Sequence, residues 1–98
     1  MSTPNSQAAT RVLRSAVAAL EHPLNPADRS SGWTDELRQA MVKWFAEMLQ
    51  KLQRNESLRG DYMKIARELD YRGVRDGRLF ALCGDTQRQL GNLHGRRA

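Results

Sequence analysis

The apolar residues of this chain recur at spacings of three and four over most of its length, which is the period of an α-helix. The period is clearest at the apolar positions Leu37, Met41, Trp44, Phe45, Met48, Leu49 and Leu52. No segment alternates strictly between apolar and polar residues, so the pattern predicts no β-strands. We therefore predict an all-α fold, a small single domain over residues 1–98 built as a bundle of about four helices, with residues 1–5 and 93–98 mobile.

The ends of the predicted helices follow from capping and helix-breaking residues. Thr34 is a suitable N-cap for the second helix, because its hydroxyl can accept a hydrogen bond from a free backbone N–H. Pro23 and Pro26 do not fit a helix interior, so residues 22–32 are predicted to form a loop. The helices are expected at about residues 6–20, 35–54, 57–69 and 76–90.

The net positive charge of the chain comes entirely from its C-terminal half. Residues 1–50 carry five cations and five carboxylates, whereas residues 51–98 carry eleven cations and six carboxylates and so hold the whole net charge of +5. Nine of these eleven cations are arginine, whose planar guanidinium matches phosphate and carboxylate groups. This asymmetry predicts an anionic partner that meets the C-terminal half.

The turn over residues 72–78 is the segment most suggestive of binding. Arginine recurs there at every third position and two glycines lie between, so guanidinium groups and backbone N–H groups could together hold phosphates. The alternative is a solvated turn whose arginines pair with neighbouring aspartates. The predicted nucleic-acid-binding residues are Arg72, Arg75, Arg78, Lys64, Arg67 and Arg88.

The stretch from Ile65 to Val74 resembles the helix-turn-helix family, whose first helix places a small residue beside an aliphatic one before a tight turn and a reading helix. Read together with the predicted helix over residues 57–69, the resemblance covers roughly a fifth of the chain. It implies that the arginines of residues 72–78 reach phosphates or guanine edges, with Lys64 and Arg67 near the DNA backbone. The chain departs from the family at residues 75–77, where a buried aliphatic residue is usual and Arg, Asp and Gly stand instead.

The sequence shows no pattern of a catalytic site, and we predict that the chain is not an enzyme. Cys83 falls on the apolar face of the fourth helix, where a thiol acts as a small hydrophobic group. His22 and His94 have no cysteine or carboxylate companions at metal-ligand spacing, so neither a metal ion nor a cofactor is predicted. Residues 59–61 match the Arg-Gly-Asp adhesion motif, which we attribute to chance.

The longest apolar runs are far shorter than the roughly 20 residues that a bilayer requires, so no membrane span is predicted. Residues 1–20 carry two arginines and no acid, which fits an organelle transit peptide, but we favour an amphipathic first helix. The lone Cys83 indicates a reducing compartment, and a cytoplasmic location is expected.

Two hypotheses for function follow from the charge. The first is a small DNA-binding protein, a transcription regulator or accessory factor that contacts duplex phosphates through its C-terminal half. It would act as a homodimer. Its expected seam is Ala9, Val12, Ala16 and Val17, which could instead close the monomer's own core. The alternative is a helical adaptor or inhibitor that binds an acidic protein partner. Replacing Arg72, Arg75 and Arg78 by Ala is expected to remove most nucleic-acid affinity and to leave the fold intact.

Overall fold

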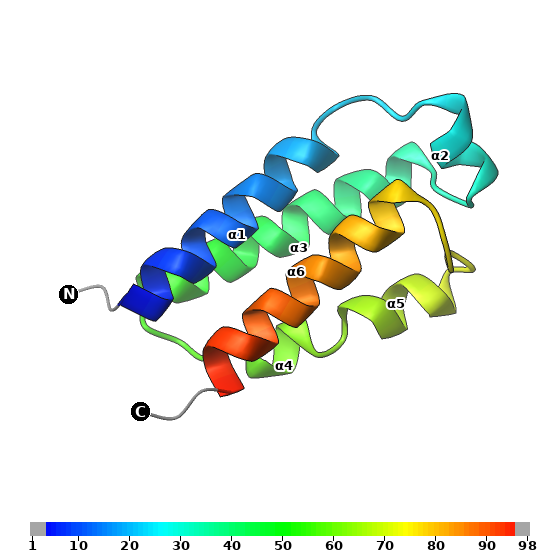
Figure 1. Ribbon diagram of the computed structural model, residues 1–98. Helices are drawn as coiled ribbons and strands as arrows, with labels where there is room; N and C mark the ends of the chain where they lie inside the picture. The colour runs from blue at the N-terminus through cyan, green and yellow to red at the C-terminus, as the bar shows by residue number, and fades with distance from the viewer. Residues whose placement is uncertain (1–3, 96–98) are drawn as a thin grey trace.

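The computed structural model describes the backbone of residues 4–95 and the side chains of residues 6–93, and this part of the chain contains helices and no strands. Four of the helices have seven residues or more, which confirms the all-α prediction and its bundle of about four helices (Figure 1). The elements are α1 (Pro4–Leu20), α2 (Pro26–Ser30), α3 (Asp35–Gln53), α4 (Arg59–Tyr62), α5 (Ile65–Tyr71) and α6 (Arg78–Gly95).

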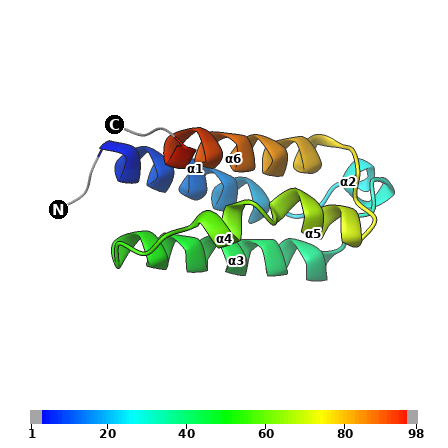
Figure 2. The same cartoon turned by 90° about the horizontal axis from the view of Figure 1, so that it is seen from below.

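The bundle is elongated, with extents of 42 × 20 × 17 Å. Helix α1 packs against both α3 and α6, and α6 also packs against α4 and α5. The short helices α4 and α5 follow one another roughly in line, so together they take the place of a fourth long helix (Figure 2). The small helix α2 lies at the end of the bundle where α5 turns into α6 (Figure 1).

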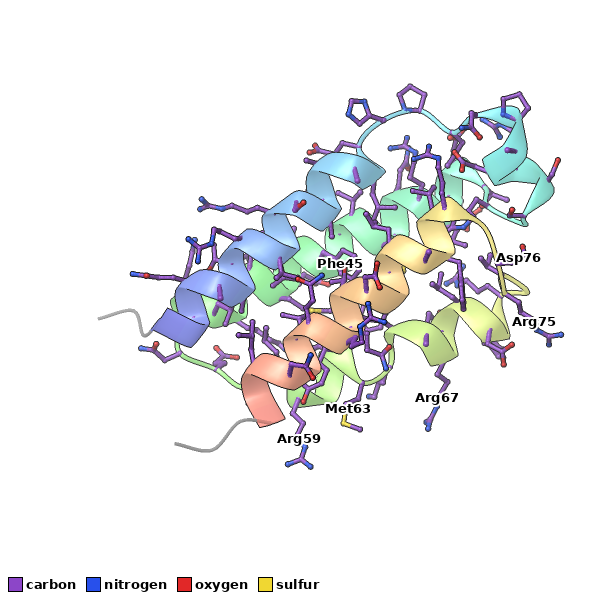
Figure 3. All side chains as sticks on the ribbon, in the orientation of Figure 1. Phe45, Arg59, Met63, Arg67, Arg75 and Asp76 are labelled. Atoms are coloured by element: carbon purple, nitrogen blue, oxygen red, sulfur yellow. The ribbon has the colours of Figure 1, made fainter. Side chains whose placement is uncertain are left out.

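The core is a single cluster of buried apolar side chains from all the main helices. Phe45 is fully buried near the middle of the bundle (Figure 3), and Trp33 is 2% exposed. Ala9 and Ala16 of the expected dimer seam are buried in this core. They therefore help to close the core of the chain itself and do not form an exposed seam for a second copy. Homodimerisation stays a prediction, but the structure leaves it without an identified contact surface.

The prediction of a loop over residues 22–32 is wrong at α2. Asn25 and Asp28 form a capping box: the Asp28 N–H donates to Asn25 Oδ1 at 2.7 Å, and the Asn25 N–H donates to Asp28 Oδ2 at 3.0 Å. Pro26 fills the first helical position, where its missing N–H costs nothing. The proline that excluded a helix interior therefore starts a helix.

The predicted helix over residues 57–69 is divided into α4 and α5 at residues 63–64. The buried side chains on both sides of the break are Leu58, Tyr62, Ile65 and Leu69, so the spacing of three and four hid the interruption. Gln87 of α6 supports the break, because its Oε1 accepts the Ala66 N–H at 2.8 Å. That N–H would otherwise be unsatisfied at the start of a helix.

The last helix is displaced from its predicted position over residues 76–90. It begins at Arg78, because Gly77 has φ +99°, outside the helical region. It runs to Gly95, so residues 93–95, which were predicted to belong to the mobile end, are helical. Likewise α1 begins at Pro4, within the segment predicted to be mobile. Residues 1–3 and 96–98 lie outside the described residues. None of the described helices has the length and apolar character needed to cross a membrane.

Candidate functional site

Four of the six predicted nucleic-acid-binding residues are paired with carboxylates of the chain itself. The pairs are Arg72 with Glu68 at 2.9 Å, Arg75 with Asp70 at 2.7 Å, Arg78 with Asp28 at 2.8 Å, and Arg88 with Asp85. Arg72 and Arg75 lie on the turn after α5, and Arg78 and Arg88 lie on α6, so the four arginines form no single free cationic surface. The predicted alternative, arginines of the turn paired with neighbouring aspartates, describes Arg75, which pairs with Asp70.

Arg78 holds the end of the bundle together. Its guanidinium contacts Asp28, whose side chain is only 2% exposed, and so joins the start of α6 to α2 across fifty positions of sequence. Gly77 of the turn serves the same packing. A Cβ built on Gly77 would lie 2.6 Å from the Ser31 hydroxyl oxygen, so a side chain there would collide with the end of α2. The close approach expected toward a ligand is made toward the chain itself.

Helices α5 and α6 do not form the helix-turn-helix arrangement. In that motif the two helices cross at a steep angle, whereas α6 runs back alongside α4 and α5 (Figure 2). Leu79 in the first turn of α6 is buried, which supplies the aliphatic contact that residues 75–77 lack. The first turn is also covered by α2, so it does not project as a reading helix.

Among the described residues of the C-terminal half, the cations without a carboxylate partner lie together along α4 and α5. Arg59, Lys64 and Arg67 are exposed, and none has a carboxylate partner among the described residues. Lys64 and Arg67 belong to the predicted site, whereas Arg59 was missed. In Figure 3, Arg59, Met63 and Arg67 project from one side of α4 and α5, away from α6. We call the residues at this four-residue spacing the ridge: Arg59, Met63, Arg67 and Tyr71, with Lys64 beside them. Arg75 lies beyond the end of α5, on the turn.

The ridge also carries the large apolar side chains that stand out in solvent. Among the described residues, Met63 is 56% exposed and Tyr71 is 85% exposed. Both follow an arginine of the ridge by four positions, and Arg67 lies midway between them. Exposed large apolar groups interspersed with unpaired cations are typical of a contact surface. The signal was present in the sequence as the spacing of four between Arg59, Met63, Arg67 and Tyr71.

The other candidates have structural explanations. Asp61 of the Arg-Gly-Asp match accepts hydrogen bonds from Trp44 Nε1 at 3.3 Å and Lys51 Nζ at 2.7 Å, so it joins α4 to α3. The hydrogen bond and charge of Asp61 raise the pKa of Lys51. Over the described residues no three His, Cys, Asp or Glu side chains gather in a way that could hold a metal ion.

Cys83 is fully buried, as its place on the apolar face predicted. Burial raises the pKa of the thiol to about 12, so at pH 8 only about one molecule in ten thousand carries the reactive thiolate. We expect a thiol reagent such as 5,5′-dithiobis(2-nitrobenzoate) to label Cys83 very slowly in native buffer and rapidly in denaturant. Fast labelling of the folded protein would contradict this burial.

No protein-family model, no curated protein and no solved structure matches this chain. The assignment of function therefore depends on the geometry of the ridge.

Proposed function

We propose that this chain binds nucleic acid and that the ridge on α4 and α5 contacts the phosphate backbone. The observation that carries the proposal is the group of three exposed cations, Arg59, Lys64 and Arg67, without carboxylate partners. Such cations release the counterions condensed on nucleic acid and need break no existing ion pair to do so.

The spacing of the ridge suits a repeating anionic backbone. Arg59 and Arg67 project from one side of α4 and α5 (Figure 3), and a strand of duplex DNA carries one phosphate per about 3.4 Å of axis. The two guanidinium groups can therefore contact different phosphates of one strand.

The paired arginines contribute unequally to this proposal. The Arg75–Asp70 pair is exposed on both sides, at 78% and 63%, and such pairs are worth about 0–1 kcal/mol. Arg75 can therefore turn from Asp70 to a phosphate at little cost. If Arg78 turned to a phosphate, the buried carboxylate of Asp28 would be left without a cation, which is costly. We therefore exclude Arg78 from the proposed interface.

Exchanging Arg59, Lys64 and Arg67 together for Ala tests the proposal. If each contacts one phosphate, the slope of log affinity against log salt should fall by about 0.9 per contact, or nearly 3 in all. The matched control replaces Arg11, Arg14 and Lys43, three exposed cations of α1 and α3. It removes the same charge from other helices. Titration of labelled duplex at several salt concentrations measures both variants. Equal losses in the two variants, or no salt-sensitive binding by the wild type, would reject the proposal.

A second candidate function is an adaptor for an acidic protein partner. The exposed Met63 and Tyr71 favour it, because Met, Tyr and Arg are the residues enriched in protein interfaces. Changing Met63 to Gln and Tyr71 to Ala distinguishes the two functions. The pair of changes should weaken binding of an acidic polypeptide such as poly-glutamate and leave duplex binding within a few-fold, since phosphate contacts depend mainly on the cations. If duplex binding is lost instead, these side chains contact the nucleic acid itself.

A further inference from the structure

A groove of about 300 Å³ lies between α3 and α5, on the flank of α5 next to the ridge. Its floor is apolar and comes from α3, with Leu37, Ala40, Met41 and Trp44. Its rim comes from α5, with Lys64, Glu68 and Arg72 at the helical spacing of four. We call it the α3–α5 groove.

The polar groups around the groove are satisfied, with one exception. Arg72 is paired with Glu68 at 2.9 Å. Asp61 fixes the Trp44 indole by accepting its N–H at 3.3 Å, and Lys51 pairs with the other Asp61 oxygen at 2.7 Å. The Lys64 ammonium alone has no partner among the described residues. The rim thus offers one free positive charge beside an apolar floor.

We propose that the α3–α5 groove binds a small amphipathic carboxylate, with its hydrocarbon part on the floor and its carboxylate on Lys64. Charge complementarity selects a monoanion, because Lys64 is a single compact cation and Arg72 is already neutralised. The groove volume is at the lower end of the range for ligand pockets, about 300–1,000 Å³, which favours a chain of medium length. This site is separate from the nucleic-acid function and shares only Lys64 with it.

The groove has features of a binding surface beyond the usual seam between two helices. Two residues of the floor present apolar surface to solvent, because Ala40 is exposed and Trp44 is half-buried. The other two, Leu37 and Met41, are buried. The small Ala40 side chain leaves the floor open next to a large indole. A hydrocarbon chain laid there would remove water from both residues, and burial of each CH₂ is worth about 0.8 kcal/mol.

Titration calorimetry with straight-chain carboxylates, from hexanoate to dodecanoate below their micelle concentrations, tests this site. Each carboxylate is compared with the alcohol of the same length. Affinity should rise by up to about fourfold per CH₂, the factor that corresponds to 0.8 kcal/mol, and then level off when the groove is full. The carboxylate should bind several-fold more tightly than the alcohol. Absence of saturable binding across the series would overturn the proposal.

Three variants locate the binding. Lys64→Gln should reduce carboxylate affinity to that of the alcohol and leave the alcohol unchanged, whereas Lys43→Gln, on an exposed part of α3 outside the groove, should change neither. Ala40→Trp should abolish binding of both ligands, since its ring fills the floor from an exposed position. The ligand-dependent change in fluorescence should disappear in Trp44→Phe. Equal behaviour of the two lysine variants, or unaltered binding by Ala40→Trp, would contradict the proposed site.

The result is independent of the proposed nucleic-acid function. Arg59→Ala with Arg67→Ala should weaken duplex binding and leave decanoate binding unchanged, because neither arginine lines the groove. If the wild-type protein binds decanoate but does not bind duplex, only the nucleic-acid proposal is rejected. If it binds duplex but does not bind decanoate, only the carboxylate site is rejected.

Discussion

Replacing Phe45 by Ala should lower the free energy of unfolding by about 3–5 kcal/mol, the usual cost of deleting a large buried ring. Phe45 is fully buried in the centre of the bundle. The change removes the apolar transfer energy of the ring and leaves a cavity that rigid helices on several sides can fill only in part. Since small domains are stable by about 5–15 kcal/mol, the variant should be close to unfolding at room temperature. Denaturant titration followed by circular dichroism measures the loss.

The adjacent Trp44 provides the control for this prediction. Trp44 is larger than Phe45 and on sequence grounds looked equally suited to the core, but it is half-buried at the α3–α5 groove. Its change to Ala should therefore cost clearly less than the Phe45 change, because part of the indole is already in water and no closed cavity is left. If Trp44→Ala destabilises the protein as much as Phe45→Ala, the ring is buried more deeply than the structure shows.

The helical period predicted the main elements because burial requires it. Along α3, the buried Leu37, Met41, Phe45 and Met48 follow spacings of four and three, and Thr34 caps the helix by accepting the Leu37 N–H at 3.0 Å. The same period could not reveal the interruption between α4 and α5. The buried residues keep their register across the break, and the support comes from Gln87, twenty-one positions away.

The candidate site was predictable only in part, because a cation is free or occupied according to the fold. The Arg72–Glu68 pair joins positions four apart on one helix and could be read from sequence. The Arg78–Asp28 pair joins residues fifty positions apart and could not. Arg59 was passed over because it stood inside an adhesion-like tripeptide, whereas its place on the ridge depends on the way α4 and α5 follow one another.

Arg78→Ala should lower the free energy of unfolding by about 2–3 kcal/mol, at or below the lower end of the range for a broken buried ion pair. Asp28 is buried, and the lost guanidinium would leave its carboxylate with only the Asn25 N–H as partner. The cost stays near the lower end because Arg78 itself is 54% exposed, so water can enter on its side. This prediction corrects the expectation that arginines of the turn can be removed without cost.

Arg75→Ala is the matched control, three residues away in the same turn. Its pair with Asp70 is exposed on both sides, so the change should alter stability by no more than about 0.5 kcal/mol. Adding Asp28→Asn to Arg78→Ala should recover part of the loss, because the neutral amide no longer needs a cation, and a double-mutant cycle measures this coupling. Equal stability of the two single variants would mean that Asp28 is solvated.

The predicted loss at Arg78 also means that a combined change of Arg72, Arg75 and Arg78 would weaken nucleic-acid binding by unfolding the end of the bundle. The ridge cations Arg59, Lys64 and Arg67 have no such structural role, so their replacement separates binding from folding.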